Sequence, residues 1–377
     1  MVNIGKNIQQ RGNYKAFIPE QFPPKGLTFN EPKIIKLLSE ADLLLGKLDG
    51  ITKLLPDIDF FIFMYIKKES AYSSQIEGTK AKLTDALQAE VEKTSELPKD
   101  VDDILHYIEA MNEGLKRLEK LPLSLRLIKE VHKVLLTGAR GAAFPYPGEF
   151  RKAQNWIMGT NPADARFVPP PPEHVLSAMG DLEKFFYSHE EVPVLIKVAL
   201  IHSQFETIHP FIDGNGRTGR LLITFYLCQQ NVLEKPVLYL SEYFKKHREF
   251  YFSMLDEYRK GDITSWLEFF LKGVVIVAKE AIETSDKIID LREKDLHKVL
   301  GLGRASKNAT ILLKNLYKLP IINVRKIQEF TGLSREAANK LAKRFVRLGF
   351  LQLKDKNKKY GRLFVYKEYL DLFDKVS

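Results

Sequence analysis

Apolar residues recur three and four positions apart through most of this chain, which is the spacing of one face of an α-helix. The pattern predicts helices over residues 32–48, 57–76, 79–92, 98–119, 124–136, 172–188, 192–207, 215–230, 246–259 and 262–298. It breaks between residues 148 and 170, where QNWIMG and RFVPP flank the turn-rich stretch TNPADA and predict a short β-hairpin. Residues 12–32, rich in proline and aromatic residues, are expected to be extended and to lie over the surface. The sequence therefore predicts a mainly α fold.

The last part of the chain, residues 304–377, follows a different pattern. A helix over 307–318 and a second helix in NVRKIQEF precede the turn TGLS and the helix REAANKLAKRFVRLGF. Ser334 is a good N-cap for that last helix, and Gly349 stands where a C′ glycine would end it. The stretch FLQLKDKNKKYGRLFVY then predicts two strands around a polar turn. Three helices followed by a hairpin are typical of a winged helix-turn-helix domain.

Charge also separates this tail from the rest of the chain. Residues 304–377 hold 18 Lys and Arg against 6 Asp and Glu, a net charge of +12, whereas the whole chain carries +10 and residues 1–303 therefore carry −2. A basic tail on a nearly neutral body predicts a partner for the tail, and nucleic-acid phosphates are one such partner.

Composition excludes several classes of protein. The 377 residues are 45% hydrophobic and 28% charged, which is typical of globular chains with two or three domains. The longest apolar run, FFIFMYI at 60–66, is far shorter than the roughly 20 residues that span a bilayer, so no membrane association is expected. The N-terminus does not have the apolar stretch of a secretory signal, and the single cysteine, Cys228, excludes an internal disulfide. We expect a cytoplasmic protein.

The stretch HPFIDGNGRTGR, residues 209–220, carries the most chemistry. Its glycines stand where a loop turns into the helix at 215–230, and a helix N-terminus with exposed amides attracts anions. Arg217 and Arg220 are three residues apart and share a face, so both favour a polyphosphate. Asp213 could hold Mg²⁺, and His209 could act as a base near neutral pH. The spacing matches neither a P-loop nor a dinucleotide-binding fingerprint.

This stretch resembles the signature of the Fic family, H-P-F-x-[DE]-G-N-G-R-x-x-R, at every position. The resemblance implies a Fic-type helical core over residues 121–300, with an N-terminal helical region over 1–120 and the winged helix over 304–377. The hairpin at 148–170 then corresponds to the flap along which a target protein docks. The implied reaction transfers AMP from ATP to the hydroxyl of a Ser, Thr or Tyr residue of that target.

The resemblance also implies a role for individual residues. His209 would deprotonate the target hydroxyl, and Asp213 would hold Mg²⁺ against the phosphates. Tyr251 and Phe252, in HREFYF, would supply the aromatic wall of the adenine pocket, although relatives often have two tyrosines there. The residues expected to contact ATP within the motif are Gly214, Asn215, Gly216, Arg217, Thr218, Gly219 and Arg220.

A second motif lies upstream, in SSQIEG at 73–78. Glu77 is expected in the last turn of the helix at 57–76, with Gly78 as its C′ residue. The helix dipole disfavours a carboxylate at this end unless a cation pairs with it. Local sequence alone fits a solvated surface glutamate equally well. Ser73, Glu77 and Gly78 nevertheless match the family's inhibitory motif, [ST]-x-x-x-E-[GN], whose glutamate pairs with the second motif arginine. That arginine is Arg220 in this chain.

The sequence thus predicts a protein adenylyltransferase restrained by Glu77, with ATP and Mg²⁺ at its site. Three alternatives stay open: removal of AMP by the same site, transfer of a different phosphate-linked group, and a DNA-binding regulator whose Fic core senses nucleotide. A homodimer is also compatible with the sequence, which does not identify the target protein.

Overall fold

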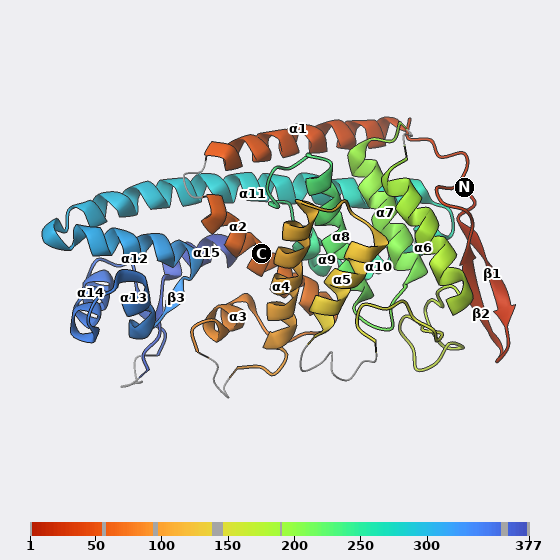
Figure 1. Ribbon diagram of the computed structural model, residues 1–377. Coiled ribbons are helices and arrows are strands. Elements are labelled where there is room, and N and C mark those ends of the chain that lie inside the picture. The colour runs from red at the N-terminus through yellow and green to blue at the C-terminus, as the bar shows by residue number, and fades with distance from the viewer. Residues whose placement is uncertain are drawn as a thin grey trace.

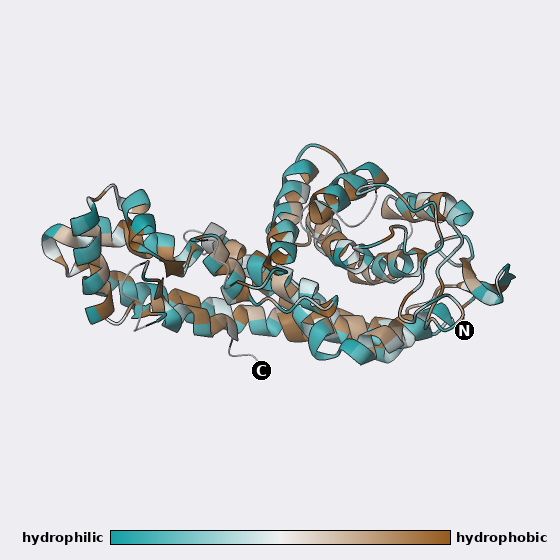
Figure 2. Cartoon of the chain, turned by 90° about the horizontal axis from the view of Figure 1, so that it is seen from below, coloured by the Kyte–Doolittle hydropathy of each residue, from teal (hydrophilic) through white to brown (hydrophobic). Residues whose placement is uncertain are grey.

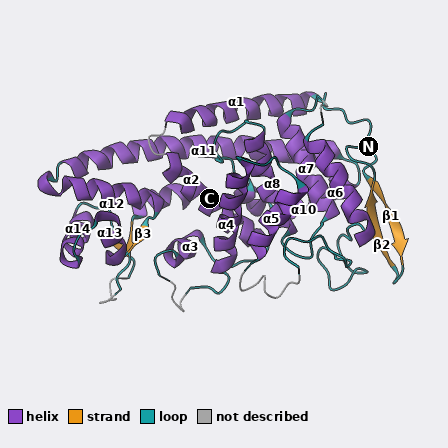
Figure 3. Cartoon of the chain, viewed as in Figure 1, coloured by secondary structure: helices purple, strands orange, loops and turns teal. Residues whose placement is uncertain are grey.

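The computed structural model describes residues 2–54, 58–92, 97–137, 146–188, 191–355 and 361–374. Helices dominate, as the periodicity predicts (Figure 3). They are α1 (Pro32–Leu54), α2 (Ile58–Ile76), α3 (Leu83–Ala89), α4 (Val101–Leu118), α5 (Leu125–Leu136), α6 (Pro172–Phe186), α7 (Val194–Ile208), α8 (Asn215–Gln229), α9 (Ser241–Lys246), α10 (Arg248–Arg259), α11 (Ile263–Leu300), α12 (Ser306–Lys318), α13 (Val324–Thr331), α14 (Arg335–Arg347) and α15 (Lys367–Asp374). The short helices α9 and α15 are not predicted by the sequence pattern.

Helix α11 runs along most of the molecule, and α1 lies beside it over much of that length (Figure 1). Asp262 begins α11 as an N-cap, because its side chain accepts a hydrogen bond from the backbone N–H of Ser265 at 3.0 Å. Apolar residues on several faces of α11 are buried, including Trp266, Phe269 and Leu271. The helix is therefore a central support that contacts both the body of the protein and its C-terminal part.

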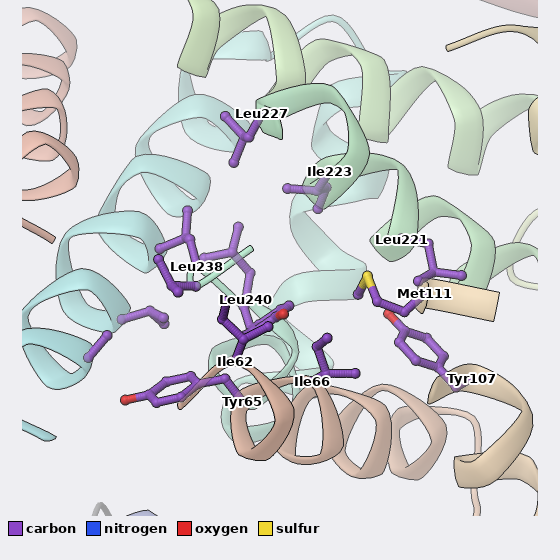
Figure 4. Packing of buried hydrophobic residues seen from close by; sticks show 14 of the residues in the cluster. Ile62, Tyr65, Ile66, Tyr107, Met111, Leu221, Ile223, Leu227, Leu238 and Leu240 are labelled. Atoms are coloured by element: carbon purple, nitrogen blue, oxygen red, sulfur yellow. The ribbon is translucent and has the colours of Figure 1, made fainter. Parts of the chain in front are cut away.

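The core beneath the motif helix is built from α2, α4 and α8, whose apolar side chains point toward one another (Figure 4). The contributing residues are Ile62, Tyr65 and Ile66 from α2, Tyr107 and Met111 from α4, Leu221, Ile223 and Leu227 from α8, and Leu238 and Leu240 from the segment before α9. This packing places the C-terminal end of α2 beside the first turns of α8, although the two helices are far apart in the sequence.

The expectation of an extended segment at residues 12–32 is confirmed for residues 14–19, but their pairing with a second strand was not predicted. Residues 14–19 form strand β2 (Tyr14–Pro19), which pairs antiparallel with β1 (Gly5–Gln10), so that Gln10 faces Tyr14 across the turn. The side chains of Ala16 and Phe17 are buried, and Phe17 donates its backbone N–H to Val168 at 2.9 Å. The segment is thus a hairpin that packs on the body of the protein.

The predicted hairpin at 148–170 is reduced to one antiparallel bridge, between Ile157 and Phe167. Between them, the Asp164 carboxylate accepts hydrogen bonds from the backbone N–H groups of Thr160 and Asn161, which folds the tip into tight turns. Prolines in this stretch have no N–H to donate to a ladder. Side-chain hydrogen bonds and proline therefore replace the longer pairing that the apolar pattern suggests.

The C-terminal residues form helices α12, α13 and α14 and a three-stranded sheet in the order β3 (Ile321–Ile322), β5 (Phe364–Val365), β4 (Gln352–Leu353). Ser334 caps α14 as predicted, accepting a hydrogen bond from Ala337 N–H at 3.3 Å, and Gly349 follows the helix with a φ of 83°. Strand β3 was not predicted, and most of the expected polar turn, residues 356–360, lies outside the described residues.

This C-terminal part and the N-terminal hairpin lie at opposite ends of the molecule (Figures 1 and 2). Buried Asp295 of α11 accepts hydrogen bonds from the hydroxyls of Tyr317 and Tyr366, which anchors the C-terminal part to the long helix. Lys67 of α2 donates to Glu90 Oε2 at 2.9 Å and to the carbonyl of Lys318 at 3.3 Å. The helix that carries Ser73 therefore also contacts the C-terminal part.

Within the described residues, every helix is too short or too polar to cross a membrane.

The close contact between α4 and α8 can be tested at Gly114. A Cβ at this position would lie 2.2 Å from Phe225 Cζ, so Gly114→Ala should lower the free energy of unfolding by about 1–3 kcal/mol through overpacking. Gly180→Ala in α6 is the matched control, because no atom lies within 4 Å of the added carbon. That control should instead stabilise the protein by roughly 0.5–1 kcal/mol. Urea denaturation measures both changes, and equal effects of the two substitutions would contradict the packing described here.

Candidate active site

A cavity of about 270 Å³ opens beside the first turn of α8, between the 148–170 segment and α10. Nine of the residues singled out in the sequence line it: Glu77, His209, Asp213, Gly214, Asn215, Gly216, Arg220, Tyr251 and Phe252. Arg217, Thr218 and Gly219 do not line this cavity, and neither do Ser73 and Gly78. The structure therefore brings the two motifs to one cavity but not every residue of each.

The motif loop connects α7 to α8 through two left-handed residues, His209 with a φ of 49° and Gly214 with a φ of 75°. Asn215 closes this loop with its side chain: Oδ1 accepts from Phe211 N–H and Nδ2 donates to Phe211 O, each at 2.8 Å. The Thr218 hydroxyl donates to the carbonyl of Gly214 at 2.8 Å. Both side chains are used to hold the loop, so only the backbone of Asn215 is left for a ligand.

Residues outside the motif hold the loop from the other side. Arg151 Nε donates to the carbonyl of His209 at 2.9 Å, and Asn155 Nδ2 donates to the carbonyl of Phe211 at 2.8 Å. His132 stacks on Phe211 with ring centroids 3.6 Å apart. These residues position His209 although no motif pattern marks them in the sequence.

The hydrogen bonds of His132 also define its tautomer. Its Nδ1 accepts from Gly148 N–H at 2.8 Å, so Nε2 carries the proton and donates to the carbonyl of Asp213 at 2.9 Å. Burial lowers the pKa of His132 to about 4, which keeps the ring neutral near pH 7. His132 thus ties the start of the 148–170 segment to the motif loop.

The N-terminus of α8 faces the cavity with the backbone of Gly214, Asn215 and Gly216. The first N–H groups of a helix have no acceptor within the helix and attract anions. A Cβ on Gly216 would lie only 2.2 Å from Glu77 Oε1, so the absence of a side chain keeps this surface open. The three residues expected to bind an anion through their backbone therefore line the cavity, with the Glu77 carboxylate close to Gly216.

Arg220 is buried, with 2% of its side chain exposed, and its guanidinium makes three hydrogen bonds to the C-terminal end of α2. Nε donates to Ser73 Oγ at 2.8 Å, while Nη2 donates to the Ser73 carbonyl at 3.0 Å and to Glu77 Oε1 at 2.7 Å. Burial acts to raise the pKa of Glu77, but the charge and hydrogen bond of Arg220 outweigh it and hold that pKa below its usual value. The ion pair expected between Glu77 and Arg220 is present.

Gly78 ends α2 as a C′ glycine, as the sequence predicts. Its φ is 98°, and the N–H groups of Gly78 and Thr79 donate to the carbonyls of Gln75 and Ser74 at 3.1 and 3.2 Å. These two bonds form a Schellman motif. The motif turns the chain away after Glu77 and leaves that side chain beside α8.

Arg217 points toward carboxylates and not into the cavity. Its Nη2 donates to Asp213 Oδ2 at 3.2 Å, and its Nη1 lies 3.9 Å from Asp103 Oδ1. Asp213 itself lines the cavity with 36% of its side chain exposed. In the part of the chain that the structure describes, no group of three or more His, Cys, Asp and Glu side chains is placed to hold a metal. Mg²⁺ commonly takes only one or two carboxylates and completes its shell with phosphates and water, so Asp213 fits such an ion.

The aromatic wall is formed by α10. Tyr251 is buried and hydrogen-bonded through its hydroxyl to His202 Nε2 at 2.8 Å, and the ring of Phe252 lies against Arg248 at 5.0 Å. His202 Nδ1 donates to the carbonyl of Gly219 at 3.0 Å, so this histidine links α7, α8 and α10. His202 is therefore a buried structural residue, as its apolar neighbours in the sequence suggest.

Five charged residues that line the cavity were not singled out in the sequence: Arg166, Glu206, Arg248, Asp256 and Arg259. Glu206 lies one helical turn before His209, and Arg259 lies under the ring of Phe167 with 3.8 Å between the guanidinium carbon and the ring centroid. The spacing of Glu206 from His209 is a signal that could have been used. Arg259 has no comparable signal, because only the fold brings α10 to the end of α7.

Together these features define the site. The motif loop of a helical domain presents a histidine, a carboxylate and a helix N-terminus to one cavity. Residues 35–116 match the family described as Fic/DOC family N-terminal, and residues 122–227 match the Fic/DOC family. The two matches follow one another and together extend from residue 35 to residue 227.

Curated relatives carry adenylyltransferase names. The chain is 28% identical over 220 residues to the probable protein adenylyltransferase aq_aa38 of Aquifex aeolicus, covering 57% of this chain and 61% of the relative. It is 33% identical over 156 residues to the protein adenylyltransferase Fic of Drosophila willistoni, covering 40% of this chain and 28% of the relative. The chain thus spans less than two thirds of each of these relatives.

Solved structures share the fold at low identity. A Fic family protein from Desulfovibrio desulfuricans G20 superposes with a TM-score of 0.58 at 18% identity, covering 91% of this chain and 98% of that chain. A Fic domain containing signaling protein from Bacteroides thetaiotaomicron superposes with a TM-score of 0.51 at 19% identity, covering 68% of this chain and 97% of that chain. The first of these likenesses extends over nearly the whole chain and supports the helical Fic fold.

Proposed function

We propose that this protein is an adenylyltransferase that moves AMP from ATP to a hydroxyl side chain of a target protein. The observation that carries the proposal is the shared cavity, where His209, Asp213 and the N-terminus of α8 lie on one wall. The adenylyltransferase names of the relatives support the same reaction. Phosphoryl-type transfers depend on positioning and on neutralising charge, and this wall offers both.

In this proposal His209 accepts the proton of the target hydroxyl as that oxygen attacks the α-phosphate, and pyrophosphate leaves. Burial and the charges of Arg259 and Arg151 lower the pKa of His209 to about 3, so the ring is neutral and able to accept a proton near pH 7. The backbone of Gly214–Gly216 binds phosphate oxygens, and Asp213 holds Mg²⁺, which would neutralise charge on the phosphates. Tyr251 and Phe252 provide ring faces for the adenine.

The target protein is proposed to dock along residues 148–170. This segment borders the cavity through Ile157, and the neighbouring side chains of Trp156 and Met158 are exposed. An extended peptide could lie against it and bring its hydroxyl toward His209.

The base can be tested by His209→Ala, with His174→Ala on the exposed face of α6 as the control. Transfer of label from α-labelled ATP to protein should fall by about 10²–10⁴-fold in the first variant, because a general base is lost. ATP binding should be nearly unchanged, since the phosphate-binding backbone is intact. Undiminished transfer by His209→Ala would contradict the mechanism.

We also propose that Glu77 restrains this activity. Its ion pair occupies Arg220, the motif arginine that would otherwise orient the γ-phosphate. A second reaction, hydrolytic removal of AMP with Glu77 activating water, is favoured by one observation: the partly exposed Glu77 carboxylate lines the same cavity as His209.

Replacing Glu77 with Gly should raise AMP transfer, including self-modification, because Arg220 becomes free to bind phosphate. Glu119→Gly is the matched control, since Glu119 also follows the last turn of a helix and is exposed, but lies on α4. The double variant Glu77→Gly with Arg220→Ala should lose the gain, and the resulting double-mutant cycle isolates the coupling between the two residues. Restraint by Glu77 is wrong if its replacement leaves transfer at the parent rate. Loss of an AMP-removing activity in the same variant would support the second reaction.

The C-terminal part is proposed to be a winged helix-turn-helix that binds DNA. Helix α14 buries Ala338, Leu341 and Phe345 on one side and exposes basic residues on the other. The exposed basic residues of α14 are Arg335, Lys340, Lys343, Arg344 and Arg347. The order of three helices and a small sheet supports this reading, and docking of a protein is the alternative use of such a surface.

If the tail binds DNA, its affinity for a short duplex should fall steeply with salt concentration, because each phosphate contact releases counterions. Lys343→Ala with Arg344→Ala should make the slope of log affinity against log salt shallower by roughly 2, whereas the exposed Lys116→Ala in α4 should not change it. Fluorescence anisotropy measures the slope. Absence of binding at low salt would favour a protein-docking role for the tail.

A further inference from the structure

Glu206 lies in the last turn of α7, three residues before His209, and its side chain is buried at the cavity wall. Its Oε1 has no hydrogen-bond partner among the described residues, and the same is true of His209 Nδ1. Glu206 Oε2 lies 3.7 Å from His209 Nδ1. The buried Nδ1 of His209, which has no hydrogen-bond partner among the described residues, thus lies nearest to the Oε2 atom of a buried carboxylate, while the unpartnered Oε1 lies beside Gly219.

We infer that Glu206 is a positioning residue for His209: its carboxylate accepts the Nδ1–H of the imidazole and so keeps Nε2 unprotonated toward the cavity. This inference rests on the proposed function, in which His209 takes a proton from the target hydroxyl. The separation of 3.7 Å is longer than a hydrogen bond, and such pairs commonly tighten only when substrate is bound. A neutral histidine can act as a base only at the nitrogen without a proton, so the choice of tautomer decides whether it can act.

The geometry also explains why the second-to-last residue of the motif, Gly219, is a glycine. A Cβ on Gly219 would lie 2.6 Å from Glu206 Oε1 and 3.1 Å from the ring of Phe205. Any side chain at position 219 would therefore push the Glu206 carboxylate away from its place. Gly219 does not line the cavity itself, so its use here is to make room for Glu206.

Several charged groups face Glu206 from neighbouring elements: Arg220 from α8, Arg259 from α10 and Glu77 from the end of α2, besides His209 itself. Burial raises the pKa of Glu206 to about 7, with Glu77 adding to the effect and the two arginines opposing it. Below that pH the carboxyl is protonated and its O–H can donate to Nδ1, which removes the preference for the Nδ1–H tautomer. Since His209 has a pKa of about 3, the loss of activity on the acid side should follow Glu206 and not His209.

The test is a comparison of Glu206→Gln with Glu109→Gln, an exposed glutamate of α4, both in the Glu77→Gly background. Glu206→Gln should lower kcat for AMP transfer by roughly tenfold or more, as loss of an orienting carboxylate does in other histidine-based sites, with the KM for ATP within about twofold. The acid limb of the pH–rate profile, expected below pH 7 in this background because Glu77 no longer raises the pKa of Glu206, should disappear. A merely structural role would change the unfolding midpoint or KM but leave that limb in place, which would overturn the inference.

A second measurement does not depend on turnover. In protein with ¹⁵N-labelled histidine, the His209 signal is the one that is missing from the spectrum of His209→Ala. At pH 8 this signal should show that the proton is on Nδ1. In Glu206→Gln, whose amide can turn an N–H toward Nδ1, and in Glu206→Leu, the preference for a proton on Nδ1 should be lost. A proton on Nε2 in the parent protein at pH 8 would overturn the inference and leave the proposed transfer reaction standing. Absence of transfer in every variant, with the proton on Nδ1, would instead contradict the proposed function alone.

Discussion

The buried guanidinium of Arg220 is the constraint on which the rest of the site depends. A charged group removed from water must be paired and hydrogen-bonded, and the three hydrogen bonds to Ser73 and Glu77 meet this need. Because Ser73 and Arg220 are 147 residues apart, the pairing requires that the end of α2 stay against the first turns of α8. The apolar contacts among α2, α4 and α8 hold the same arrangement from the other side (Figure 4).

In the motif loop, some residues face the cavity and others hold the conformation of the loop. Asn215 and Thr218 belong to the motif, yet their side chains bind the loop's own backbone. Arg151 and His132 lie outside the motif, yet they hold the carbonyls of His209 and Asp213. A short signature can therefore mark where the chemistry occurs while much of the positioning comes from sequence that the signature does not include.

The sequence predicts features that depend on neighbours along the chain. Helical periodicity, the Ser334 N-cap and the glycines that end α2 and α14 are local, and they are found where expected. The pairing of β1 with β2 was missed because β1, GKNIQQ, has one apolar residue and therefore shows no alternation of apolar and polar positions. The 148–170 segment was overestimated because its apolar pattern does not reveal that Asp164 would take up the backbone N–H groups. Contacts such as Arg259 with Phe167 depend on how distant helices pack, which no local pattern reports.

At the contact between α2 and α8, Gly216 makes the α8 side less tolerant of substitutions than the α2 side. The lack of a side chain there serves two purposes, since it leaves the helix N-terminus open and allows the Glu77 carboxylate to approach Arg220. A substitution at Gly216 that displaced Glu77 would cover the anion-facing backbone in the same step. A homologue that has lost this contact but kept the cavity must therefore differ on the α2 side, at Ser73 or Glu77. Substitutions among relatives should therefore accumulate first at Ser73 and Glu77. Gly216 should stay unchanged, because both the open N-terminus of α8 and the approach of Glu77 to Arg220 require it.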